Sequence, residues 1–99
     1  MPSFGNPFAG KNSDRKLTKS ELIRAVRMMV AAEYEAIQMY NQLAESIDNK
    51  LAIKVLNDVA NEEKVHAGEF LKLLHELAPS EEKFYDKGYN EVIDKMKGE

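Results

Sequence analysis

Residues 50–77, KLAIKVLNDVANEEKVHAGEFLKLLHEL, decide the fold of this chain. The stretch contains no proline, and its seam residues recur at alternating intervals of four and three, which places them on one face of an α-helix. The seam consists of Ala52, Leu56, Val59, Glu63, His66, Phe70, Leu73 and Leu77. The stretch therefore predicts one long helix with Glu63 and His66 set into an otherwise apolar face.

A matching seam precedes it in the chain. Thr18 is suited to cap a helix start, and Glu21 three residues later completes a capping box. No proline or glycine follows until after residue 47, where SIDNKL forms a turn and Asp48 or Asn49 caps the second helix. The first seam consists of Leu22, Val26, Met29, Glu33, Ala36, Tyr40, Leu43 and Ile47.

Each seam is accompanied by a second apolar line whose members are seven residues apart. The first helix has Ile23, Val30, Ile37 and Ala44, and the second has Ile53, Ala60, Ala67 and Leu74. A stripe of this width is typical of the core of a helix bundle rather than of a two-stranded contact.

The polar positions of the two seams lie at one height. Helices joined by a short turn run antiparallel, and Glu33 and Glu63 each lie fifteen residues from Asp48. His66 follows one helical turn later, within about 5 Å along the axis. Two interpretations stay open: a hydrogen-bonded cluster that fixes the register of the core, or a divalent metal site of carboxylates and imidazole. The matched heights favour the metal site.

One chain supplies only half of such a site. Carboxylate-bridged di-iron bundles draw a Glu from each of two helices and a Glu-x-x-His from each of two others. This sequence has one set on two long helices, so we predict a homodimer that holds two Fe ions, with Mn, Zn or Ca as substitutes.

Composition narrows the function classes. The 99 residues carry a net charge of −3 and no cysteine, which excludes disulfides, thiolate zinc sites and iron–sulfur clusters. Interspersed charges indicate no nucleic-acid partner, and no apolar run is long enough to cross a membrane. The N-terminus lacks the pattern of an export signal, so we expect a cytoplasmic protein.

The chain divides into three segments. We predict an irregular N-terminal arm over 1–17, a helical hairpin over 18–78, and a short C-terminal helix and tail over 79–99. Pro79 ends the second helix, and Ser80 is the expected cap of the third.

Residues 28–46, MMVAAEYEAIQMYNQLAES, and 51–74, LAIKVLNDVANEEKVHAGEFLKLL, resemble the encapsulated ferritins. The resemblance implies an all-α fold in which an antiparallel two-helix hairpin with a short C-terminal helix dimerises into a ferritin-like four-helix bundle. It also implies a ferroxidase that oxidises Fe(II) with O2 between two subunits, in a decameric ring inside an encapsulin nanocompartment that stores or detoxifies iron. The implied metal ligands are Glu33, Glu63 and His66.

The resemblance assigns further residues around the centre. Glu35 matches a glutamate of the site where metal enters, and Tyr40 matches a tyrosine near the centre, whereas Ala32 and Met39 depart from the family pattern. The chain ends DKMKGE without the apolar tail that targets the shell, so we expect either a shortened chain or another route of encapsulation.

Other candidates have simpler interpretations. Glu62 turns about 100° away from Glu63 and is either solvated or an auxiliary carboxylate where metal enters. Glu69 has the same two interpretations as Glu62, a surface charge or an auxiliary carboxylate, and we expect His75 to be exposed. The alternative functions are a rubrerythrin-like peroxidase, disfavoured by the lack of cysteines for a rubredoxin-type electron donor, and an oligomeric scaffold with a structural metal.

Overall fold

The computed structural model describes residues 14–98, which form three α-helices and, within that range, no strand. The helices are α1 (Lys19–Glu45), α2 (Lys50–Leu77) and α3 (Pro79–Lys97). The all-α prediction is confirmed, and α2 has the predicted bounds, while α1 ends two residues before the expected Ile47. Most of the predicted N-terminal arm lies outside the described residues.

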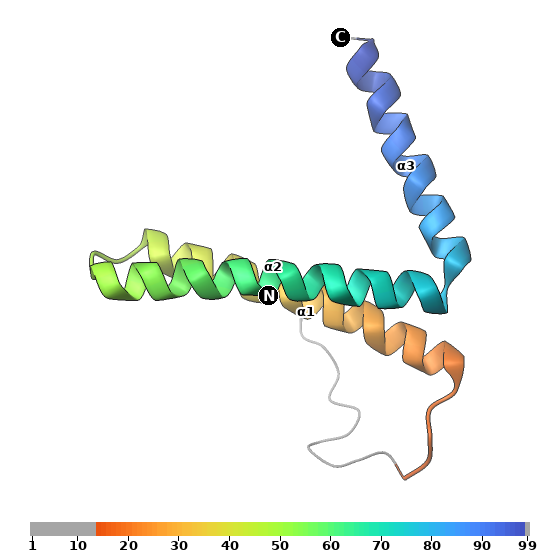
Figure 1. The fold of residues 1–99 in the computed structure, drawn as a ribbon, viewed down its shortest axis with the longest axis horizontal. Helices are drawn as coiled ribbons and strands as arrows, with labels where there is room; N and C mark the ends of the chain where they lie inside the picture. Colours follow the sequence, from red (N-terminus) through yellow and green to blue (C-terminus); the bar gives the residue numbers. More distant parts are fainter. Residues whose placement is uncertain (1–13, 99) are drawn as a thin grey trace.

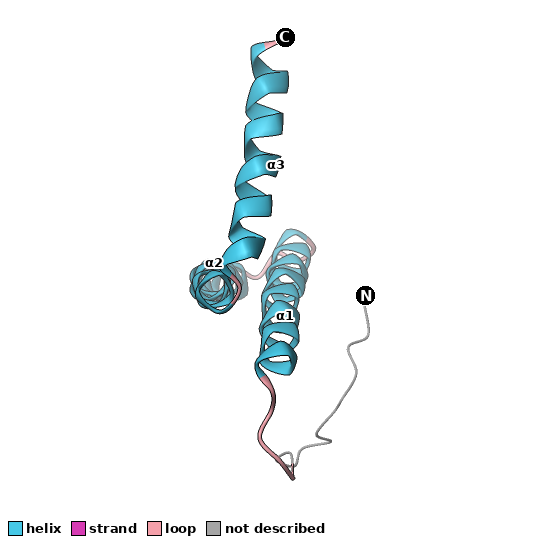
Figure 2. Cartoon of the chain, turned by 90° about the vertical axis from the view of Figure 1, so that its right-hand side faces the viewer, coloured by secondary structure: helices cyan, strands magenta, loops and turns pink. Residues whose placement is uncertain are grey.

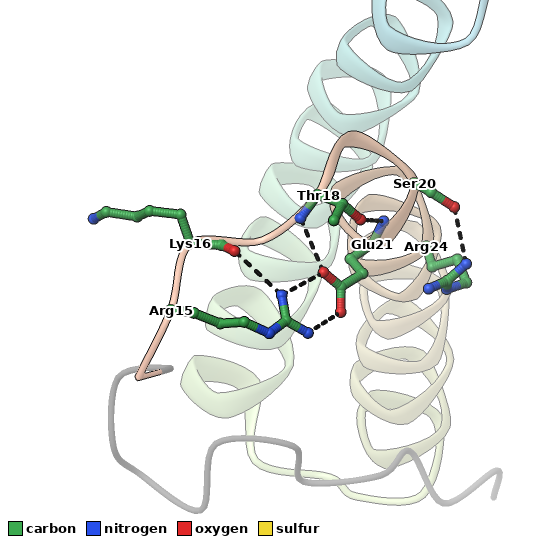
Figure 3. A network of polar contacts seen from close by, with 6 residues as sticks. All are labelled: Arg15, Lys16, Thr18, Ser20, Glu21 and Arg24. Carbon is green, nitrogen blue, oxygen red and sulfur yellow. Dashed lines mark hydrogen bonds and ion pairs between the residues drawn. The ribbon is translucent and has the colours of Figure 1, made fainter.

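The start of α1 has the predicted capping box (Figure 3). The Glu21 amide donates to Thr18 Oγ1 at 3.2 Å, and the Thr18 amide donates to Glu21 Oε1 at 2.9 Å. Arg15 donates from both terminal nitrogens to the two Glu21 carboxylate oxygens, each at 2.7 Å. These hydrogen bonds, the one from Arg15 above all, lower the pKa of Glu21 to about 2.

A four-residue turn, 46–49, connects α1 to α2. The Ser46 amide bonds back to the Leu43 carbonyl, and Asn49 Oδ1 accepts from the Ala52 amide at 2.9 Å. Asn49, not Asp48, is therefore the cap of α2. The short turn reverses the chain, so α1 and α2 lie side by side and antiparallel (Figures 1 and 2).

The contact between α1 and α2 is made mainly by the flanking lines rather than by the seams. The buried residues are Val26, Val30, Ala44, Ala60, Ala67 and Leu74, and only Val26 among them belongs to a seam. Leu22, Met29 and Leu43 of the first seam are 40%, 44% and 50% exposed. The seams thus stay partly open along one side of the hairpin.

Helix α3 leaves the end of the hairpin at a steep angle (Figure 1). Ala78 is the single non-helical residue between α2 and α3, with φ −135° and ψ 72°. Pro79 starts α3 as well as ending α2, since proline is tolerated at the first helical position, where the missing N–H costs nothing. The prediction that Ser80 caps this helix is wrong, because no side chain caps it.

A group of polar side chains, which we call the junction cluster, ties α3 to the hairpin. Arg27 of α1 donates to Glu81, Tyr85 OH also donates to Glu81, and His75 Nδ1 lies 3.2 Å from Glu82 Oε2. The His75 and Tyr85 rings meet edge to face at 5.2 Å. His75 was expected to be exposed, but α3 covers it and leaves its side chain 17% exposed.

None of the three described helices is both long enough and apolar enough to span a lipid bilayer.

Candidate metal centre

Three side chains converge on the open side of the hairpin. Glu33 comes from α1, and Glu63 and His66 come from α2; one ligand atom from each lies within 4.8 Å of the other two. His66 Nδ1 is 3.6 Å from Glu63 Oε2 and 3.9 Å from Glu33 Oε2. Ligand atoms around one cation, at bond lengths of about 2.0–2.3 Å, are separated by comparable distances. We call this group the candidate centre.

Helix geometry explains the convergence. Glu63 and His66 are three residues apart, so both project from one side of α2. Glu33 reaches the same height because the 46–49 turn sets the register of the hairpin. Behind the centre, Ala60 and Ala67 are buried at 1% and 4% exposure, and their small side chains let the helices approach closely.

The carboxylates of the candidate centre lack neutralising partners. Their side chains are 17% exposed for Glu33 and 19% for Glu63, yet no ion pair joins either of them to a lysine or arginine among residues 14–98. Glu33 Oε2 is fully covered and accepts no hydrogen bond. A covered, unsatisfied carboxylate oxygen is costly unless a cation or donor satisfies it. The hard oxygens and the imidazole nitrogen therefore fit a divalent metal of the iron, manganese or zinc type.

The other predicted site residues do not join this group. Tyr40 lies on the same seam of α1, two turns closer to the 46–49 turn, and is partly buried. Glu35 is partly buried and its Oε2 has no hydrogen-bond partner, whereas Glu62 is exposed. None of the three contributes to the set of close ligand atoms.

One further neighbour of the candidate centre is Glu69, for which the sequence favours the interpretation as a surface charge. A hollow of about 250 Å³ is lined by Glu33, His66, Glu69 and Phe70. Glu69 is three residues beyond His66, and this i,i+3 spacing was the available signal. An exposed glutamate on a helix is more often a solvated charge, so this spacing alone does not distinguish the two interpretations of Glu69.

Comparison with known proteins agrees with this architecture. Residues 25–97 match the sequence pattern of the rubrerythrin family. The crystal structure of the encapsulated ferritin domain from Pyrococcus furiosus superposes with a TM-score of 0.83 and 38% identity, over 92% of both chains.

Two curated relatives extend the comparison. A ferritin-like–encapsulin shell fusion protein of Pyrococcus furiosus is 41% identical over 81 residues, which are 82% of this chain and 24% of that protein. The encapsulin nanocompartment cargo protein EncC of Myxococcus xanthus is 37% identical over 76 residues, 77% of this chain and 58% of the relative. The chain thus spans about a quarter of the first relative and over half of the second.

The antiparallel hairpin, its steeply angled third helix and the Glu and Glu-x-x-His pattern define the class of ferritin-like helical proteins. Within that class the similarity is specific to one branch, because sequence identity and superposition agree over nearly the whole chain. The chain belongs to the encapsulated ferritins of the rubrerythrin and ferritin-like family.

Proposed function

We propose that this protein is a ferroxidase, which oxidises Fe(II) to Fe(III) with O2 at a dinuclear site shared by two copies of the chain. The observation that carries the proposal is the candidate centre, where two carboxylates and an imidazole from both helices converge and no lysine or arginine of residues 14–98 neutralises them. Iron is the substrate of this reaction.

The second copy is proposed because the centre lies on an open face. Exposed apolar residues of the seams flank it, including Leu22, Met29, Leu43 and Leu73 at 40–50% exposure. Apolar surface of this kind is stabilised by burial against another subunit. A two-fold contact would bring a second Glu33, Glu63 and His66 to the same place and complete a four-helix bundle. Larger rings of such dimers, a decamer by resemblance, are part of the same proposal.

The side chains of the chain itself have defined tasks in this reaction. Glu33 and Glu63 bind the incoming cation and favour the product, since carboxylates stabilise the higher charge of Fe(III) more than that of Fe(II). His66 binds as neutral imidazole. Each O2 takes one electron from each of four Fe(II) ions and, with four protons, becomes two water molecules.

The test is oxidation of Fe(II) in air, followed by the absorbance of Fe(III). We expect the wild-type protein to exceed the rate in buffer, and both Glu63→Ala and His66→Ala to fall to the buffer rate. Glu45→Ala removes an exposed carboxylate at the end of α1 and should keep the wild-type rate. Circular dichroism confirms that each variant is helical. Wild-type rates in both ligand variants would refute the proposal.

We also propose that the protein works inside an encapsulin shell. The support is that both curated relatives carry encapsulin in their names, one as a fusion with the shell and the other as its cargo. When the chain is co-expressed with an encapsulin shell protein, it should co-purify with the assembled shells. Purified shells that do not contain the co-expressed chain would contradict this proposal.

A rubrerythrin-like peroxidase is a second candidate, supported by the family match over residues 25–97. Peroxide consumption with an added reductant separates the two. A ferroxidase consumes O2 as Fe(II) is oxidised, whereas a peroxidase would turn over peroxide faster than it turns over O2.

A further inference from the structure

The hollow beside the candidate centre contains a carboxylate to which neither the sequence pattern nor the comparisons assign a task. Glu69 lines this hollow together with Glu33, His66 and Phe70. It lies one turn of α2 beyond His66, on the side away from the 46–49 turn. Glu62, the other exposed glutamate near the centre, does not line the hollow.

The charge of Glu69 is not neutralised within residues 14–98. Lys72 lies three residues further along α2, within reach of an i,i+3 pair, but it pairs with Glu76 at 2.7 Å instead. Glu21, Glu81 and Glu82, by contrast, each have an arginine or histidine partner. Glu69 therefore lines the hollow with a carboxylate that no cationic side chain among the described residues pairs with.

The hollow also offers a destination for a cation. Glu33 Oε2 is covered, accepts no hydrogen bond and belongs to a side chain that lines the same space. Phe70 supplies an apolar wall, and a charge beside a low-dielectric wall attracts counter-ions more strongly than one in open water. A cation held near Glu69 is thus drawn further towards Glu33 and His66.

We infer that Glu69 is a loading carboxylate: it attracts a hydrated divalent cation into the hollow and passes it to Glu33 and His66. This inference rests on the proposed function, because it supplies that centre with its substrate. A single carboxylate holds a hydrated divalent cation only weakly, so the cation moves on to the centre, where three ligand atoms await it. Glu69 is therefore not a permanent ligand.

The experiment uses Co(II) without oxygen, because its visible absorption reports when it gains protein ligands. Stopped-flow mixing gives the rate of association, and titration gives the number of ions bound. The variants are Glu69→Gln, which removes the charge and keeps the shape, Glu63→Gln, which removes a centre ligand, and Glu45→Gln as the matched control. Glu45 is an exposed glutamate at the end of α1 and does not line the hollow.

We expect Glu69→Gln to slow association roughly fivefold at low ionic strength, because the variant loses one negative charge that attracts the divalent ion. The number of bound ions should be unchanged, the difference should shrink in high salt, and Glu45→Gln should behave as wild type. Wild-type association in Glu69→Gln would overturn the inference, and so would a reduced number of bound ions.

The same data separate the two hypotheses. If wild-type protein binds no Co(II), the proposed function fails and the loading role fails with it. If wild-type protein binds Co(II), Glu63→Gln abolishes binding and Glu69→Gln associates at the wild-type rate, only the loading role is refuted.

Discussion

The chain contains two groups of one histidine and two glutamates, and they differ in how their charges are satisfied. In the junction cluster, Arg27 and Tyr85 donate to Glu81, and His75 faces Glu82. In the candidate centre, Glu33 and Glu63 face His66, and no arginine, lysine or tyrosine among the described residues donates to either carboxylate. The same residue types thus make a closed structural contact at one end of the hairpin and an open site near its middle.

The difference teaches how to distinguish a structural ion-pair cluster from a binding site. At the junction, the guanidinium of Arg27, followed by the Tyr85 hydroxyl, lowers the pKa of Glu81, and Glu81 in turn raises the pKa of Tyr85. Both carboxylates of the junction cluster thus have a partner within one chain, although His75 Nε2 is covered and has no hydrogen-bond partner. The centre leaves a covered carboxylate oxygen unsatisfied, which costs stability until a cation arrives. Among the described residues, the lack of a donor to the two carboxylates, rather than the presence of a histidine or of acids, distinguishes the candidate centre from the junction cluster.

The largest expected effect is the stabilisation of the protein by a metal ion bound at the candidate centre. A bound divalent ion at a hundredfold excess over its dissociation constant should raise the free energy of unfolding by about 2.7 kcal/mol. Glu33→Ala removes the α1 ligand and should abolish this gain. Thermal melts with and without Zn(II) measure it, and Arg27→Ala serves as the junction control that keeps the gain. An equal gain in Glu33→Ala would mean that the metal binds elsewhere.

A second prediction concerns the packing of α1 against α2 at Ala60, which supports the candidate centre but not the junction cluster. Ala60 is 1% exposed between α1 and α2, and Ala60→Leu forces extra volume into a filled contact. Overpacking of this kind costs about 1–3 kcal/mol, which urea denaturation measures. Metal affinity should fall with it because Glu33 and Glu63 are moved apart. Ala60→Gly creates no such overlap, so a similar loss of affinity in that variant would contradict the explanation.

Disruption of the junction cluster should reduce the local stability of α3 alone. Arg27→Ala leaves Glu81 without its strongest donor, and α3 has no buried residue to hold it otherwise. We expect amide hydrogen exchange in α3 to become roughly tenfold faster, while protection in α1 and α2 stays unchanged. Arg24→Ala is the matched control, because Arg24 also lies on α1 and, among the described residues, bonds to Ser20 and not to α3. Faster exchange throughout the hairpin would show that the junction supports the whole fold.

The smallest effect is a shift in titration. The pKa of Glu81 is lowered from 4.5, so its contribution to stability is present above pH 4.5 and is lost as the pH falls through the lowered value. Carbon NMR of the Glu81 carboxyl should therefore show a midpoint below pH 4.5 in the wild type. In Arg27→Ala the midpoint should move back towards 4.5, whereas in Arg24→Ala it should not. An unchanged midpoint in Arg27→Ala would mean that another group lowers it.

Much of the architecture could be predicted because it depends on local signals. Thr18 and Glu21 form the capping box, α2 has its predicted bounds, and Glu33, Glu63 and His66 meet because equal distances from a short turn fix equal heights. Their assignment as metal ligands stays a prediction.

The sequence did not predict which apolar line of each helix is buried or that His75 is covered, because both features depend on contacts between helices. Both the seams and the flanking lines are apolar, and periodicity within one helix cannot tell which line faces the other helix of the same chain. The burial of Ala60 and Ala67, with Leu43 left exposed, answers that question only in three dimensions. His75 was misjudged for the same reason, since its cover comes from α3, whose direction no periodicity encodes.

The single residue between α2 and α3 has a mechanical consequence. Two rigid rods meet at Ala78, so two backbone torsions decide where the 19 residues of α3 point. A rod of that length is about 28 Å long, and a rotation of about 10° at its base carries its tip roughly 5 Å. Tyr89, Val92 and Met96 lie along the outer half of this lever and are 55–67% exposed. Small changes of the torsions at Ala78 therefore cause large displacements of the C-terminal end of α3.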